Sequence, residues 1–106
     1  MAKVIYDKLV RDNIPTIIEN AGKTCVTKIV SNDEVINYLI KKAHEEIDEL
    51  AEAKSSEEMA DVLEVISAII EKLGLDTKEV EDIQRKKALK NGAFKENIIL
   101  LEVEDK

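Results

Sequence analysis

Cysteine and aromatic side chains are scarce in this chain of 106 residues. Cys25 is the only cysteine, which excludes an internal disulfide and a metal centre built on several thiolates. We interpret Cys25 as a small apolar residue within a strand, because no histidine-rich neighbourhood would activate it as a nucleophile. Aromatic residues make up 3% of the chain, so it lacks the stacking surfaces with which proteins bind single-stranded nucleic acid.

The chain also lacks an excess of positive charge and any long apolar run. Its formal net charge is -7, and such a surface repels phosphate, which argues against a nucleic acid polymer as partner. No segment approaches the ~20 apolar residues of a membrane span, and the first residues do not resemble a signal peptide. We therefore expect a cytoplasmic protein with no membrane partner. The length predicts one domain over residues 1–106, with a modest core that oligomerisation would complete.

Helical patterns dominate what remains. Pro15 suits the first turn of a helix that runs to about Asn20. Apolar residues at helical spacing predict two longer helices, over about 33–53 and about 56–73. A further helix is predicted to begin at Asp76 and to run to about Lys90. The helix over 56–73 is apolar on two sides, which predicts that it lies inside a bundle, at a dimer interface.

Two short segments rich in β-branched and aliphatic residues predict strands, over 24–30 and 97–103. These segments could pair with each other. The predicted fold is therefore a mainly all-α helical bundle with a small peripheral β pair.

The densest chemistry lies between Glu45 and Asp61, where eight residues are acidic. Glu46 and Glu49 are three residues apart, as are Glu58 and Asp61, so each pair shares a helix face. Like charges at this spacing repel by a few tenths of a kcal/mol. If a short turn folds the two helices antiparallel, the four carboxylates meet and offer Mg²⁺ the hard oxygen ligands it prefers.

Two structural explanations compete with this metal site. The first is an ordinary solvated acidic face. The second concerns Glu58, which stands three residues after Ser55 as in a capping box, although Ser56 could equally be the cap. His44 is interpreted as a surface histidine, because nothing pairs it with a nucleophile.

Basic residues gather at two other places. Lys8 and Arg11 stand near the start of the chain, and the helix that ends at Lys90 also carries Lys87 in its basic last turns. The cations at the end of this helix either complement the helix dipole, worth about 0.3–1 kcal/mol, or bind phosphate. The sequence leaves both explanations open.

Three blocks of sequence resemble one known family. They are YDKLVRDNIP over 6–15, EEIDE followed by EEMAD between Glu45 and Asp61, and KKALKNGAF over 86–94. Together they are similar to the MazG-like nucleoside triphosphate pyrophosphohydrolases, specifically to their small phosphoribosyl-ATP pyrophosphohydrolase-like branch. The resemblance covers nearly the whole chain.

The resemblance implies an all-α fold that forms dimers or higher oligomers and uses Mg²⁺, with Mn²⁺ as the alternative. The implied activity is hydrolysis of a nucleotide between its α- and β-phosphates, which gives the monophosphate and pyrophosphate. Carried over by position, the metal ligands are Glu46, Glu49, Glu58 and Asp61, supported by Glu45. Glu46 or Glu49 would also orient or deprotonate the attacking water.

The resemblance also implies substrate-binding residues: Lys8, Arg11, Lys87, Lys90 and Asn91. Asn91 is a departure, because relatives often carry Arg at this position and Asn brings no charge. Two alternative functions stay open at this point. One is hydrolysis of phosphoribosyl-ATP in histidine synthesis, and the other is a non-catalytic helical module that dimerises or binds nucleotide.

Overall fold

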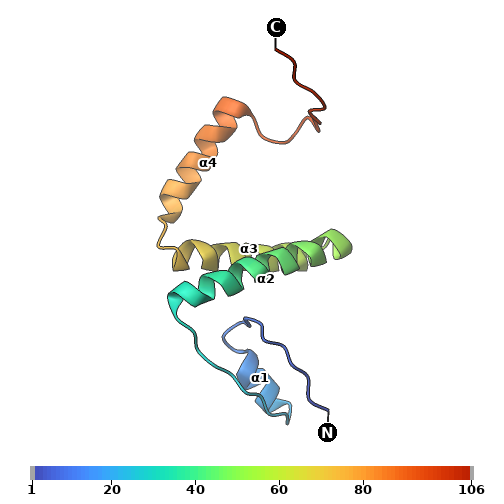
Figure 1. Cartoon of the computed structure of the whole chain (residues 1–106), viewed down its shortest axis with the longest axis vertical. Coiled ribbons are helices and arrows are strands. Elements are labelled where there is room, and N and C mark those ends of the chain that lie inside the picture. Colours follow the sequence, from blue (N-terminus) through green and yellow to red (C-terminus); the bar gives the residue numbers. More distant parts are fainter. Residues whose placement is uncertain (1, 106) are drawn as a thin grey trace. The chain divides into compact units, whose positions relative to one another are not determined.

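The computed structural model describes residues 2–105, and its helices follow the predicted order. They are α1 (Ile14–Asn20), α2 (Asn32–Ala53), α3 (Ser56–Lys72) and α4 (Thr77–Asn91) (Figure 1). The helical part of the predicted fold is confirmed. The chain divides into two compact units, one that ends at Leu75 and one that begins at Asp76.

Side-chain caps begin the longer helices. Ser31 Oγ accepts a hydrogen bond from the Glu34 backbone N at 3.2 Å, and Ser55 Oγ does the same for the Glu58 N at 3.2 Å. Asp76 caps α4 by accepting from two backbone N–H groups. Each cap satisfies N–H groups that the first helical turn leaves without a partner. Ser55, rather than Ser56, is therefore the cap of α3.

Antiparallel packing of α2 against α3 forms the centre of the first unit (Figure 1). The connection between them is short because Lys54 adopts a left-handed conformation, with φ of 50°, and closes α2 directly before the Ser55 cap. Leu39, Val62 and Val65 are the buried hydrophobic side chains of residues 2–105. A core of this size is small for a chain that must fold alone.

One side of the α2–α3 pair carries exposed apolar side chains. Ile40 and Ile47 follow directly after Leu39 and Glu46, the buried residues of α2, and Leu63 likewise follows Val62 on α3. Successive residues of a helix point about 100° apart, so a residue that follows a buried one points away from the α2–α3 contact. Because the two helices are antiparallel, these residues of α2 and α3 lie on the same side of the pair. We call this the apolar face; its exposed members are Ile40, Ile47, Met59, Leu63, Ile66 and Leu73. No helix of the described chain is long and apolar enough to cross a membrane.

The predicted β pair is wrong. Residues 24–30 and 97–103 contain no strand, and neither segment makes a ladder of backbone hydrogen bonds within residues 2–105. Val26 and Ile29 are 101% and 100% exposed, so their β-branched side chains pack against nothing that would stabilise a sheet. The two segments also belong to different compact units. Cys25, expected in the first strand, lies in the link between α1 and α2.

Candidate metal centre

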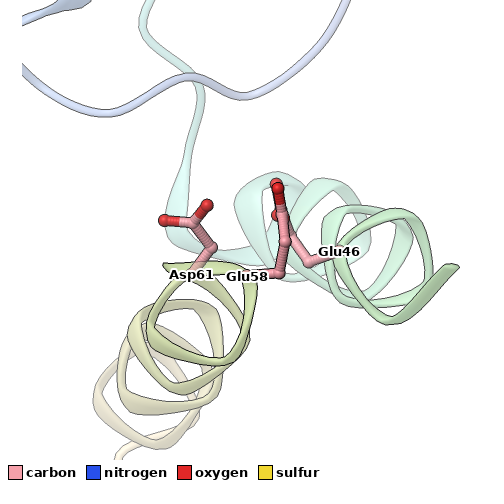
Figure 2. A group of neighbouring side chains, drawn as sticks. All are labelled: Glu46, Glu58 and Asp61. Atoms are coloured by element: carbon pink, nitrogen blue, oxygen red, sulfur yellow. The ribbon is translucent and has the colours of Figure 1, made fainter. Parts of the chain in front are cut away.

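Three of the four predicted metal ligands come together on one side of the α2–α3 pair. Glu46 comes from α2, and Glu58 and Asp61 come from the first turns of α3 (Figure 2). Each offers one carboxylate oxygen, and these oxygens lie within 4.8 Å of one another. The antiparallel packing creates this group, because it sets the end of α2 beside the start of α3.

The Ser55 cap contributes to the position of Glu58. Its hydroxyl holds the backbone N–H of Glu58, which fixes the first turn of α3. A full capping box would also use the Glu58 carboxylate, yet Glu58 Oε2 is buried and has no hydrogen-bond partner. The cap thus explains where Glu58 stands but leaves its carboxylate available.

Glu46 is the most unusual group in this cluster. The residue is only 7% exposed, and its Oε2 atom has no hydrogen-bond partner. Burial without a partner is costly for a carboxylate, since the charged form loses its hydration. Glu46 comes from α2 and lies beside Glu58 and Asp61 of α3 (Figure 2).

Electrostatics raise the pKa of two members. For Glu46, burial is the main cause, and the Glu49 charge adds to it while Lys42 opposes it. For Glu58, loss of hydration again comes first, followed by the charges of Glu49 and Asp61. Both carboxyl groups therefore resist ionisation, which is the response expected where like charges lie close together and lose part of their hydration. A bound cation would favour the ionised carboxylates and so lower these pKa values.

Glu49, the fourth predicted ligand, is placed differently. It is exposed, and it is not part of the group whose oxygens lie within 4.8 Å. Its charge nevertheless acts on both Glu46 and Glu58, so it stands close to the cluster. Its exposed carboxylate keeps access to water.

Two predicted substrate-binding residues contact acidic side chains of the helix pair. Arg11 Nη2 donates to Asp61 Oδ1 at 2.7 Å, and Lys8 Nζ donates to Glu45 Oε1 at 2.8 Å. The Lys8–Glu45 hydrogen bond, together with the Lys8 charge, lowers the pKa of the Glu45 carboxyl group. The segment around Lys8 and Arg11 therefore contacts the acidic side of α2 and α3, although it is distant from Glu45 and Asp61 in sequence.

The structure adds two lysines that sequence reasoning missed. Lys42 Nζ lies 3.6 Å from Glu46 Oε1, and Lys41 lines a shallow groove with Asp7, Asn37 and Tyr38. Both stand four residues before a glutamate of the acidic block, a spacing that places side chains together on a helix. The spacing of four residues between each lysine and its glutamate could have identified both lysines from the sequence.

The remaining predicted residues lie elsewhere. Lys87, Lys90 and Asn91 are exposed residues of α4, in the second compact unit. Within that unit Arg85 forms an ion pair with Asp82. His44 is exposed on α2, which agrees with its interpretation as a surface histidine.

The residues present fit a divalent cation. All three donors are carboxylate oxygens, the ligand type that Mg²⁺ and Mn²⁺ prefer, and Glu46 and Glu58 each carry a buried carboxylate oxygen without a hydrogen-bond partner. Adjacent ligands of octahedral Mg²⁺ are about 3 Å apart and opposite ligands about 4.2 Å apart, so the three oxygens would move closer together around a bound ion. No protein-family model, curated protein or solved structure matches this chain.

Proposed function

We propose that this protein is a divalent-cation-dependent nucleotide pyrophosphohydrolase, which hydrolyses nucleoside triphosphates between the α- and β-phosphates. The observation that carries the proposal is Glu46, a buried carboxylate with an orphaned oxygen that shares its site with Glu58 and Asp61. A solvated acidic face does not explain this burial. The resemblance of the three sequence blocks supplies the reaction.

Each group of the chain would have a distinct task. Glu46, Glu58 and Asp61 would hold Mg²⁺ or Mn²⁺, which supplies positive charge for the phosphate oxygens. Exposed Glu49 would accept the proton of the attacking water, because it is adjacent to the cluster and hydrated. The water oxygen bonds to phosphorus, the bridging P–O bond breaks, and pyrophosphate leaves.

Basic residues of the first unit would bind the phosphates. Lys8 and Lys42 lie in contact with the acidic residues of α2, and Lys41 is one residue from Lys42. Ammonium groups bind phosphate through charge-assisted hydrogen bonds. The predicted contribution of Lys87, Lys90 and Asn91 on α4 remains part of this proposal.

We further propose that the active form contains two copies of the chain, joined through the apolar face. On α3, Met59, Leu63, Ile66, Ile70 and Leu73 follow alternating spacings of four and three residues. This is the spacing of helices that pack side by side in four-helix bundles. The same face on a second copy is self-complementary, and pairing would leave the acidic side, bearing Asp61, turned outward.

Pyrophosphate release from a panel of nucleotides, with and without Mg²⁺, tests the activity. We expect Mg²⁺-dependent release with at least one nucleotide, and loss of turnover in Glu49→Gln and Asp61→Asn variants that remain folded. Turnover confined to phosphoribosyl-ATP would assign the chain to histidine synthesis instead. Nucleotide binding without turnover on any substrate would show a non-catalytic module and would contradict the proposal.

A further inference from the structure

Two side chains near the start of the chain, in a segment without helix or strand, contact the α2–α3 pair. Residues 2–11 contain no helix or strand, and this segment contacts the helix pair through Lys8 on Glu45 and Arg11 on Asp61. Arg11 thus engages a proposed metal ligand directly, whereas Lys8 engages a neighbour of the cluster. The two contacts are 2.8 Å and 2.7 Å long.

We propose that Arg11 is an internal counter-ion, which a divalent cation displaces from Asp61 so that the guanidinium becomes available to phosphate. This proposal rests on the metal centre proposed above. It assigns the segment around Arg11 a regulatory role, since the same residue would resist cation binding first and assist the substrate afterwards.

The Arg11–Asp61 ion pair and a cation bound by Asp61 exclude each other, because Arg11 and the cation are both positively charged. Asp61 Oδ1 accepts from Arg11 at 2.7 Å, so a cation bound by Asp61 would stand a few ångströms from a guanidinium. Two positive charges at that separation repel, and the binding of either weakens the other. Glu46 and Glu58 make no such contact with the segment in the described chain, so Asp61 is the point of competition.

The pair is suited to exchange. Its side chains are 58% and 41% exposed, and ion pairs exposed to this degree contribute little to stability. They can therefore separate at small cost. A buried pair would instead lock the cation out.

A released Arg11 has the right chemistry for the substrate. Guanidinium presents a planar fork of donors that matches two phosphate oxygens at once. Arg11 would stay beside the cluster after its release. Lys8, three residues before Arg11, would still bind Glu45 and hold the segment against α2. The predicted role of Arg11 in substrate binding and its observed contact with Asp61 then describe two states of one side chain.

Binding of Mn²⁺ alone, measured from the electron paramagnetic resonance signal of free Mn²⁺, tests the displacement without any turnover. The full-length chain is compared with Arg11→Gln, Arg11→Lys and a matched control, Arg85→Gln, which breaks the Arg85–Asp82 pair of α4. Circular dichroism verifies that each variant is folded.

We expect R11Q to bind Mn²⁺ about fivefold more tightly than the natural chain, because one opposing charge near the cation is gone. R11K keeps the charge and should stay near the natural affinity, as should R85Q. The difference between R11Q and the natural chain should shrink in 1 M salt, where charges are screened beyond about 3 Å.

Equal or weaker Mn²⁺ binding by folded R11Q, with the natural chain still binding, would overturn the displacement and leave the metal centre intact. Absence of Mn²⁺ binding by the natural chain would instead contradict the metal centre itself. The two failures are therefore distinguishable.

Discussion

Lys42 Nζ lies 3.6 Å from Glu46 Oε1, one helical turn earlier on α2, yet the pKa of Glu46 is raised rather than lowered. Burial of the carboxylate and the charge of Glu49 outweigh this partner. The contrast with Glu45 is informative, because its partner Lys8 does lower the pKa of that carboxyl group. The Lys42 ammonium group therefore compensates the Glu46 charge only in part, and a bound divalent metal ion would compensate it further.

The stability of the cation-free protein should fall as pH rises from about 4.5 toward neutrality. The pKa values of Glu46 and Glu58 are raised above their ordinary value of 4.5, so the folded state binds more protons than the unfolded chain. Their stabilising contribution is complete below 4.5 and is lost as pH passes the folded-state pKa. Glu45 acts in the opposite sense, but only below its ordinary pKa.

Urea unfolding with a chelator present, between pH 4.5 and 8, measures this slope. Glu46→Gln should be more stable than the natural chain at neutral pH and should show a flatter profile. Glu57→Gln, on α3 and outside the cluster, should keep nearly the natural slope, because the Glu57 charge is the smallest of the causes that raise the pKa of Glu58. A profile that rises toward neutral pH would contradict the electrostatic description of Glu46.

Divalent cations should stabilise the folded protein. A ligand at a hundred times its Kd adds about 2.7 kcal/mol to the free energy of unfolding when it binds the folded state alone. Thermal unfolding with increasing Mg²⁺ should therefore shift the Tm of the natural chain and of E57Q upward. The shift should disappear in E46Q and in Asp61→Asn; an equal shift in all four proteins would indicate non-specific binding.

Removal of the α3 cap should affect stability and cation binding together. Ser55→Ala deletes the hydroxyl that holds the Glu58 N–H, which costs about 1 kcal/mol in comparable helices. Because the same turn positions Glu58, the Mn²⁺ affinity should also fall. Ser56→Ala is the matched control, since Ser55 rather than Ser56 is the cap. Loss of stability with unchanged Mn²⁺ affinity would show that Glu58 is positioned independently of the cap.

Charge placed on the apolar face should separate the two copies. Leu63 is 58% exposed in one chain and would be buried in the proposed dimer, so Leu63→Asp should yield monomers in size-exclusion chromatography with light scattering. Val26→Asp, at a fully exposed site outside the face, should leave the dimer intact. A natural chain that is monomeric at every concentration would contradict the proposed interface.

Local signals predicted the helices well. Ser31, Ser55 and Asp76 cap helices where the sequence offers a hydroxyl or carboxylate before an apolar-periodic stretch. The strands failed because β propensity describes a half-buried surface, and Val26 and Ile29 have no neighbour to pack against.

Spacing likewise predicted part of the candidate site. Pairs three residues apart placed Glu58 and Asp61 together correctly. Glu46 and Glu49 differ because three residues rotate by about 300°, which leaves Glu49 about 60° around α2 from Glu46, on the exposed edge rather than the buried side. The contact of Arg11 with Asp61 spans 50 residues, and no local pattern encodes a contact over that separation.

Product analysis by phosphorus NMR tests the central claim most directly. With Mg²⁺ and a nucleoside triphosphate that is turned over, the natural chain and E57Q should give monophosphate and pyrophosphate in equal amounts, while E46Q gives neither. Release of orthophosphate and a diphosphate, or undiminished turnover by folded E46Q, would contradict the account.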